Sequence, residues 1–487
     1  MAEETVTEPN ERPSVSRLEE LGYKQDLRRR LHVGHVVGLA LADVSPTMAV
    51  LFLTAGVFAI GGTFALGANL LLFLVVMLIA LCLAELASIY PIAGGMYSLV
   101  RNVLPGPFTW VTMFNYLLQG VVIPASIAIG VAQFLKDLTG ITVSDQLFGL
   151  VLLALAAGIA LLAVEFGAWV TITMVVVELV VLGIITVAAF ANPNQPIGEV
   201  IFNPVVLDGD ALKAVSFGIV LATLAPAFNV INGYDATLGF SEELVGGERA
   251  IARAVVIAAF LASVFILIPL IAAVVAAPDL KAFFNAEAPI VYSVEQSLGS
   301  SARYVVDFGA AIALFNANIS LLMYFGRGVY ATGRDGIWPP PISRVLAKLN
   351  RFGAPAAGVL ALAIPAAILI FATALDFLII FSGTIIAAVY FCVGLAAIWS
   401  RISQRDIRRP YRMPLWPLPP IIVVAFTGIA LVTQEPQYLI AELVLIAIAV
   451  GMWAVSRFWS GSQKRDEREV GTAGAPPTDP EAERPPR

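Results

Sequence analysis

The stretch FNVINGYDATLGFSEE, residues 228–243, decides how this sequence is interpreted. It follows the apolar run AVSFGIVLATLAPA (214–227), and polar residues then break the apolar pattern in close succession. Asn232-Gly233 favours a turn. An outer half-helix is therefore expected to end near Phe228 or Asn229. The carbonyl groups of its last turn, up to Val230 and Ile231, would lack helical partners and attract a cation.

After the turn we expect an inner half-helix. Asn232 is a candidate cap for this second helix, and Asp235 would lie in its first turn, where an acidic side chain compensates the helix dipole. The pattern therefore predicts a helix that is interrupted in its middle.

The composition sets the environment of this helix. The chain has 487 residues, of which 59% are hydrophobic and 13% charged, whereas soluble domains carry about 25% charged residues. This composition indicates an all-α polytopic membrane protein, with the lipid bilayer as its surroundings. Cys82 and Cys392 lie in apolar runs and suggest neither a disulfide framework nor a metal site. No catalytic or phosphate-binding motif is visible, so we expect no enzyme activity, no cofactor, no metal and no nucleic-acid partner.

Runs of about 20 apolar residues predict twelve transmembrane helices. They lie near 34–59, 63–90, 106–135, 146–164, 168–190, 212–239, 253–277, 303–331, 355–374, 377–399, 415–433 and 438–459. With the N-terminus inside, only Lys136, Lys213, Lys281 and Arg303 fall on the outer side, which predicts both termini in the cytosol. Residues 1–30 would be a cytosolic tail, 31–460 the transmembrane domain in the plasma membrane, and 461–487 a disordered cytosolic tail.

The first span, GLALADVSPTMAVLFLTAG (38–56), contains a second interruption. Pro46 cannot donate to the helix ladder, and Ser45-Pro46 is typical of a helix start. A fresh half-helix is expected from Pro46, with N–H groups near Thr47 and Met48 that attract an anion. A single break is as easily a packing kink. Here the breaks lie in spans one and six, which are the first spans of two successive sets of five. Breaks in corresponding positions favour a transporter with inverted repeats and a central site.

Three further stretches carry a family resemblance. They are AELASIYPIAGGMYSLVRNVLPGPFTWVTMFNY (84–116), NGYDATLGFSEELVGGERAIARAV (232–255) and YFGRGVYATGRDGIWPPPISRV (324–345). They resemble the amino acid–polyamine–organocation (APC) transporter superfamily. The resemblance implies a LeuT-like fold with inverted repeats at about 34–190 and 212–399, two extra helices at 415–459, and secondary transport of amino acids or related amines.

One departure from the family concerns the first break. Many members carry a glycine-rich run whose amides hold the substrate carboxylate, whereas this sequence has ADVSPT (42–47). A carboxylate could still bind the amides of Thr47 and Met48, while Asp43 suits an amine or another cation. We therefore expect the substrate site at Asp43, Val44, Ser45, Pro46, Thr47 and Met48, at Phe228, Asn229, Val230, Ile231, Asn232 and Gly233, and at Asn115 and Tyr116.

Glu178 lies in the middle of the fifth span, TITMVVVELVVLGII (171–185). A carboxyl group at this depth is costly, and such groups are usually functional. Several proton-coupled members of the family carry a lysine at the matching place, beside spans one and eight. Glu178 is thus predicted to carry the coupling proton. The alternative is a neutral Glu178 that only bonds a neighbouring helix.

Polar residues on span eight offer a further candidate set. Asn316, Ser320 and Tyr324 share one helix face and are predicted to line the path or an ion site, or to hydrogen-bond between helices.

The sequence therefore predicts a proton-coupled importer of amino acids or amines that works by alternating access. The alternatives are a polyamine, small organic cation or inorganic cation transporter, an exchanger and, with less support, a channel.

Overall fold

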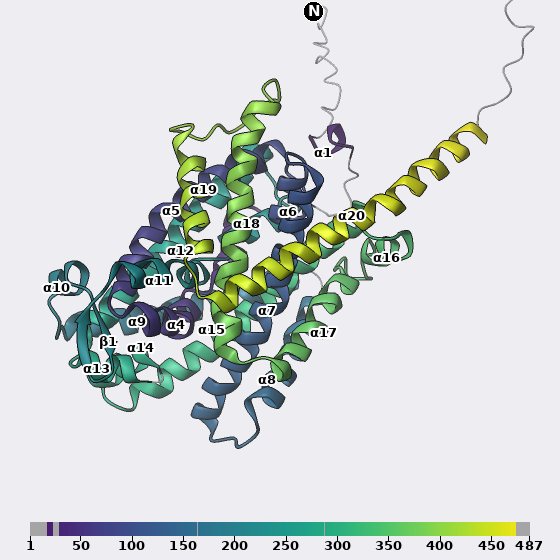
Figure 1. Ribbon diagram of the computed structural model, residues 1–487. Helices are drawn as coiled ribbons and strands as arrows, with labels where there is room; N and C mark the ends of the chain where they lie inside the picture. The colour runs from purple at the N-terminus through teal and green to yellow at the C-terminus, as the bar shows by residue number, and fades with distance from the viewer. Residues whose placement is uncertain (1–16, 23–28, 163, 287, 474–487) are drawn as a thin grey trace, which may run out of the picture.

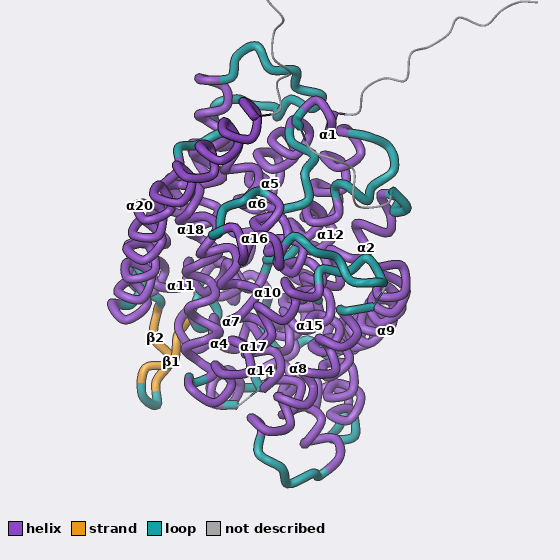
Figure 2. The backbone as a smooth tube through the Cα atoms, turned by 90° about the vertical axis from the view of Figure 1, so that its right-hand side faces the viewer, coloured by secondary structure: helices purple, strands orange, loops and turns teal. Residues whose placement is uncertain are grey.

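The computed structural model describes residues 17–22, 29–162, 164–286 and 288–473. Helices make up most of this part of the chain, and its strands are confined to one small hairpin (Figure 2). Figure 1 shows the helices gathered into one bundle, with the C-terminal helix α20 crossing its surface.

Among the described residues, eight helical segments are long and apolar enough to cross a membrane. They are Val33–Gly61 (α2, α3, η1 and α4), α5 (Phe64–Ile89), α7 (Gly106–Thr139), α9 (Val164–Ala191), α12 (Glu248–Ala276), α15 (Ala302–Arg334), α18 (Leu375–Ser403) and α20 (Pro436–Ala473).

A ninth span is bent, and three apolar helices are shorter. The bent span joins α11 (Phe217–Val230) to the 3-10 helix η2 (Tyr234–Phe240). The shorter helices are α8 (Asp145–Ala160), α17 (Ala356–Ala372) and α19 (Leu418–Val432). These segments coincide with the twelve predicted positions, so a polytopic helical membrane protein is confirmed. The crossing of all twelve segments and the inverted repeats stay predictions.

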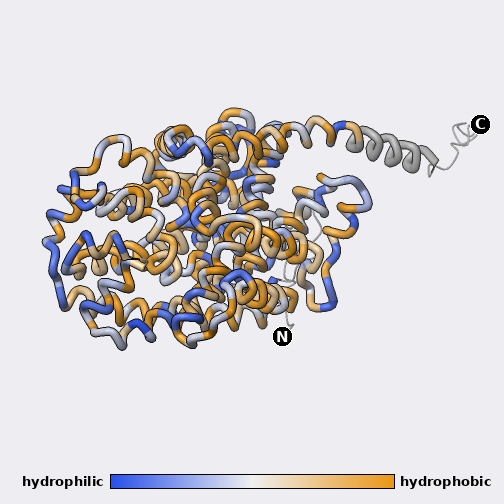
Figure 3. Tube along the Cα trace, turned by 60° about the horizontal axis from the view of Figure 1, so that its bottom comes forward, coloured by the Kyte–Doolittle hydropathy of each residue, from blue (hydrophilic) through white to orange (hydrophobic). Residues whose placement is uncertain are grey.

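The surface of the bundle suits a lipid environment. On α9, Trp169 is 69% exposed and Val187 is 71% exposed. Figure 3 shows hydrophobic residues along most of the helices and hydrophilic residues mainly in the segments that connect them. Such large exposed apolar side chains would be costly in water, but face hydrocarbon without penalty.

The first predicted break is present. Helix α2 (Val33–Val44) ends at Ser45, which adopts a left-handed conformation with φ 42°. Helix α3 (Pro46–Met48) begins directly at the proline and continues into a π-helical turn, η1 (Ala49–Leu53), and α4 (Thr54–Gly61). Ser45 occupies the N-cap position, but its side chain does not cap the new helix. Its hydroxyl group has other partners, described below.

The second break also lies where it was expected, with two corrections. The restart, η2, is a 3-10 helix rather than an α-helix, and it is bent by 40° from α11. Gly233 with φ 107°, and not Asn232, occupies its N-cap position. The Asn232 side chain instead accepts a 3.0 Å hydrogen bond from Tyr390 Oη on α18. The Asn232 side chain is therefore bonded to a residue of α18 and does not cap η2.

The two breaks touch each other. A Cβ atom built on Gly233 would lie 2.7 Å from Asp43 Oδ2 and 2.8 Å from the Val44 amide nitrogen. Only glycine has both the positive φ and the absent side chain that this approach requires.

Short elements connect the long helices. They comprise α1 (Arg17–Glu20), α6 (Gly95–Arg101), α10 (Ile197–Phe202), α13 (Leu280–Asn285), α14 (Pro289–Leu298), α16 (Pro340–Leu346) and the hairpin β1 (Val205–Asp208) and β2 (Ala211–Ala214). The hairpin corrects two expectations, because the fold is not purely helical and the sixth span begins at Phe217 rather than 212. Its antiparallel pairing runs from Val205–Ala214 to Asp208–Ala211.

The predicted tails lie partly outside the described residues. Residues 1–16, 23–28 and 474–487 are not among the residues that the structure describes. Helix α20 continues to Ala473, past the predicted start of the C-terminal tail at 461.

Gly233→Ala should destabilise the protein, because the new methyl group meets Asp43 and the backbone of Val44 while φ remains positive. We expect a loss of about 1–3 kcal/mol of folding free energy, seen as a lower melting temperature in detergent. Gly183→Ala on α9, where a new Cβ meets nothing within 4 Å, is the control. Equal melting temperatures for the two variants would contradict the close contact.

Candidate functional site

The first break is tied to spans five and eight through Ser45. Its Oγ lies 3.1 Å from Glu178 Oε2 on α9 and 3.2 Å from the Ala313 carbonyl oxygen on α15. Thr47 donates a 3.1 Å hydrogen bond to the backbone carbonyl of Glu178. Glu178 is fully buried. The structure thus brings together Ser45, Thr47 and Glu178 beside span eight.

The donor count around Ser45 depends on the protonation of Glu178. A serine hydroxyl has one proton to donate. If Ser45 donates to the Ala313 carbonyl, a protonated Glu178 can donate in turn to Ser45 Oγ, and every group in this chain is satisfied. If Glu178 is ionised, its carboxylate accepts the hydrogen bond from the Ser45 hydroxyl group, and the Ala313 carbonyl no longer receives one. The second carboxyl oxygen, Oε1, has no hydrogen-bond partner in the protein.

Asp43 faces the second break. Its side chain is 3% exposed, and Oδ1 has no hydrogen-bond partner. Asp235, in the first turn of η2, lies within electrostatic reach of Asp43 and accepts a 2.7 Å hydrogen bond from Tyr324 Oη. Buried carboxyl oxygens without partners are rare and costly. The pair therefore marks a place where a cationic group would be stabilised.

The residues before Gly233 are buried and held by span ten. Asn229 donates to the Ile379 carbonyl at 3.1 Å, and the Phe228 ring packs 5.9 Å from Tyr390 and 5.8 Å from Phe426, between ring centroids. Val230 and Ile231 are fully buried. These contacts fix the end of α11, and they give the break an apolar wall on one side.

The three polar residues of span eight each reach a different helix. Asn316 donates to the Thr171 carbonyl at 3.1 Å, Ser320 donates to the Leu39 carbonyl at 3.1 Å, and Tyr324 bonds Asp235. They are thus interhelical contacts around the breaks. Asn316 Oδ1 remains without a partner, so this residue also has an acceptor to offer.

The two candidates on span three lie apart. The Tyr116 ring packs 5.7 Å from Tyr324, and a Cβ on Gly95 would collide with Tyr116 Oη, which places Tyr116 between the breaks and the start of α6. Asn115 donates to Val111 of its own helix and faces Glu442 on α20. Successive side chains on a helix point about 100° apart, so the structure brings Tyr116 but not Asn115 towards the breaks.

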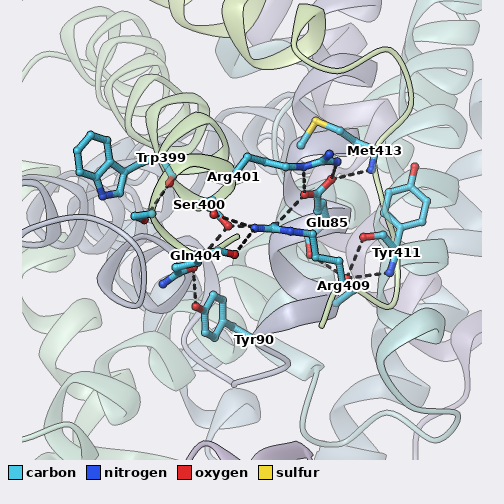
Figure 4. Close-up of polar contacts among 11 residues, drawn as sticks. Glu85, Tyr90, Trp399, Ser400, Arg401, Gln404, Arg409, Tyr411 and Met413 are labelled. Carbon is cyan, nitrogen blue, oxygen red and sulfur yellow. Dashed lines mark hydrogen bonds and ion pairs between the residues drawn. The ribbon is translucent and has the colours of Figure 1, made fainter. Parts of the chain in front are cut away.

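A network of ion pairs closes the predicted cytosolic side (Figure 4). Glu85, at the end of α5, accepts two hydrogen bonds from Arg401 at 2.7 and 2.6 Å and one from Arg409 at 2.9 Å. The Met413 amide donates a fourth bond at 2.7 Å. The network fastens α5 to α18 and to the segment that follows it.

Two more buried acids continue this closure beside η2. Glu242 pairs with Arg334 at 2.9 Å, and Glu243 pairs with Arg327 at 2.9 Å, both arginines belonging to α15. Arg327 and Arg334 lie in one of the stretches that resemble the family (324–345). Nothing in the sequence alone pairs these arginines with particular acids, so the two contacts were not predicted.

Comparison with known proteins gives consistent matches. A family model described as "Amino acid permease" matches residues 35–455. The branched-chain amino acid permease BcaP of Lactococcus lactis is 26% identical over 82% of this chain and 87% of its own length. An uncharacterized amino-acid permease of Schizosaccharomyces pombe is 28% identical over 68% of this chain and 64% of its own length. The amino-acid permease BAT1 of Arabidopsis thaliana is 24% identical over 66% and 68%.

Glu85→Gln should destabilise the protein by about 3–5 kcal/mol, because it leaves Arg409 buried beside an uncharged partner. The Arg409 side chain is only 4% exposed. Thermal unfolding in detergent measures the loss. Asp406→Asn, an exposed acid in the same segment, should leave the melting temperature unchanged. A Glu85→Gln protein as stable as the wild type would show that the ion pairs contribute nothing.

Proposed function

This chain belongs to the amino acid permease family, and we propose that it is a secondary active transporter that imports an amino acid or a related amine across the plasma membrane. The observation that carries the proposal is the direct contact of two interrupted helices at Gly233 and Asp43, with unpartnered buried oxygen atoms beside it. Interrupted helices that meet inside a bundle offer both helix ends and backbone groups to a ligand.

The two ends of an amino acid find complementary groups at the breaks. The restart at Pro46 presents the N–H groups of Thr47 and Met48, and a helix start favours an anion such as a carboxylate. Asp43 Oδ1 and the last carbonyl groups of α11 suit the ammonium group. The site therefore uses backbone groups for one end of the substrate and a side chain for the other.

The surroundings of the breaks favour an apolar substrate side chain. Val44, Phe228 and Ile231 are buried beside them, and one relative is named a branched-chain amino acid permease. Leucine, isoleucine and valine are therefore the first substrates to test. An amine without a carboxylate would leave the Thr47 and Met48 amides without an anion.

Proton coupling would use Glu178. The carboxyl group is bonded to Ser45 at the break and to no cationic side chain among the described contacts. Protonation of Glu178 changes whether the Ser45 hydroxyl group donates to the carboxyl group or to the Ala313 carbonyl. Ser45 has the left-handed conformation and joins α2 to α3. Protonation at α9 is thereby linked to the conformation of the substrate site.

Alternating access requires the predicted cytosolic side to open. Glu243–Arg327 and Glu242–Arg334 join the exit of the sixth span to the eighth. We infer that these pairs separate or slide when the site opens to the cytosol, while the contact between the two breaks stays intact.

Glu178→Gln should abolish the stimulation of leucine uptake by an acidic exterior and leave exchange measurable, because glutamine keeps the shape but cannot carry the proton. Uptake into proteoliposomes with and without an imposed pH gradient measures this. Glu199→Gln, on the exposed segment after α9, is the control. Undiminished gradient-driven uptake in Glu178→Gln would rule out the coupling role.

Asp43→Asn should weaken the binding of substrates that carry an extra positive charge more than the binding of neutral amino acids, by about tenfold or 1.4 kcal/mol. Competition against labelled leucine, with lysine and valine as competitors, measures the ratio. An equal loss for both classes would show that Asp43 contacts only the α-ammonium group that they share, and an unchanged affinity for both would rule out contact between Asp43 and a cationic group.

A further inference from the structure

A second group of buried polar side chains lies away from the two breaks. Thr112, Asn115 and Gln119 share one face of α7, since they are spaced by three and four residues. That face meets α18 at Cys392 and α20 at Glu442. Helices α7, α18 and α20 pack against one another, as Figure 1 also shows. We call these five residues the α7–α20 cluster.

The cluster is rich in oxygen atoms without partners. Neither carboxyl oxygen of Glu442 has a hydrogen bond of good geometry, although the Asn115 side chain lies beside them, and Thr112 Oγ1, Asn115 Oδ1 and both polar atoms of Gln119 also lack partners. Thr112, Asn115 and Gln119 are fully buried, and Glu442 is 2% exposed. The cluster is thus shielded from solvent, and most of its polar atoms have no partner in the protein.

This arrangement is costly without a ligand. A buried polar group without a hydrogen bond costs about 1–3 kcal/mol, and a charged group costs more. Packing does not explain the presence of these polar side chains, because leucine or methionine would fill the same space between α7 and α20 without burying unbonded polar groups. Polar side chains thus lie between these packed helices where apolar ones would be the stable choice.

We propose that the α7–α20 cluster binds a sodium ion. Carboxylate, amide and hydroxyl oxygens are hard ligands that suit a hard cation. Glu442 supplies one negative charge and the neighbouring oxygens of Asn115, Thr112 and Gln119 supply none, so the charge balances a monovalent ion. Cys392 is a soft, neutral neighbour and takes no part in coordination.

The sodium site is separate from the substrate site. Asn115 and Tyr116 are adjacent in α7, yet Tyr116 packs on Tyr324 beside the breaks while Asn115 faces α20. The bound ion would join α20 to α7 and α18. It therefore supports the twelfth predicted span rather than touching the substrate or Glu178.

Thermal unfolding of the purified full-length protein in NaCl and in choline chloride at equal ionic strength tests the proposal. Sodium should raise the melting temperature of the wild type saturably, by at least about 2 °C, because it binds only the folded state. Glu442→Gln should lose this rise. Glu435→Gln, which changes an exposed acid directly before the same helix, and Glu178→Gln should keep it.

Two results with the wild type and with Glu442→Gln would overturn the proposal. One is a wild-type protein with the same melting temperature in both salts, and the other is a Glu442→Gln protein that keeps the full response to sodium. If Glu442→Gln does not fold, Asn115→Ala replaces it, with a sodium midpoint expected at least about tenfold higher. Loss of the response in Glu178→Gln instead would move the ion to the first break and equally contradict a site at α20.

Discussion

The close approach of Gly233 to Asp43 and Val44 is the constraint on which the rest of the structure depends. Two membrane helices are interrupted, and irregular backbone inside a membrane is tolerated only where it is buried in protein or lines a cavity. Each break is buried partly by the other, without a side chain between them. Ser45 must then take a left-handed conformation, and its hydroxyl group is directed to Glu178 and α15.

Polar groups in the bundle fall into two kinds. At the predicted cytosolic side, Glu85 and Glu242 have both carboxyl oxygens hydrogen-bonded to arginines. Around the breaks, Asp43 and Glu178 keep carboxyl oxygens without partners. A protein that needed only stability would satisfy both. The paired acids stabilise the conformation that is closed on the predicted cytosolic side. The acids with unpartnered oxygens can accept a proton or a cationic group and release it again.

Local sequence rules predicted the helices and the places where they break. Pro46 and Asn232-Gly233 act on their own backbone, so their effects are readable from a short stretch. The rules failed where a partner comes from a distant helix. Tyr390 takes the Asn232 side chain away from the expected cap, and α20 draws Asn115 towards Glu442. The location of Glu178 beside Ser45 was predictable only through the family resemblance, and its role in coupling remains a prediction.

Counterflow tests the central proposal, that one site at the breaks is exposed to the two sides in turn. Proteoliposomes are loaded with unlabelled leucine, isoleucine or valine and diluted into a trace of the same labelled amino acid, with no ion gradient. A carrier that alternates should concentrate the label transiently inside the vesicles before it decays. A label that only rises to the outside concentration, in proportion to the added amount and without saturation, would identify an open pore and contradict alternating access.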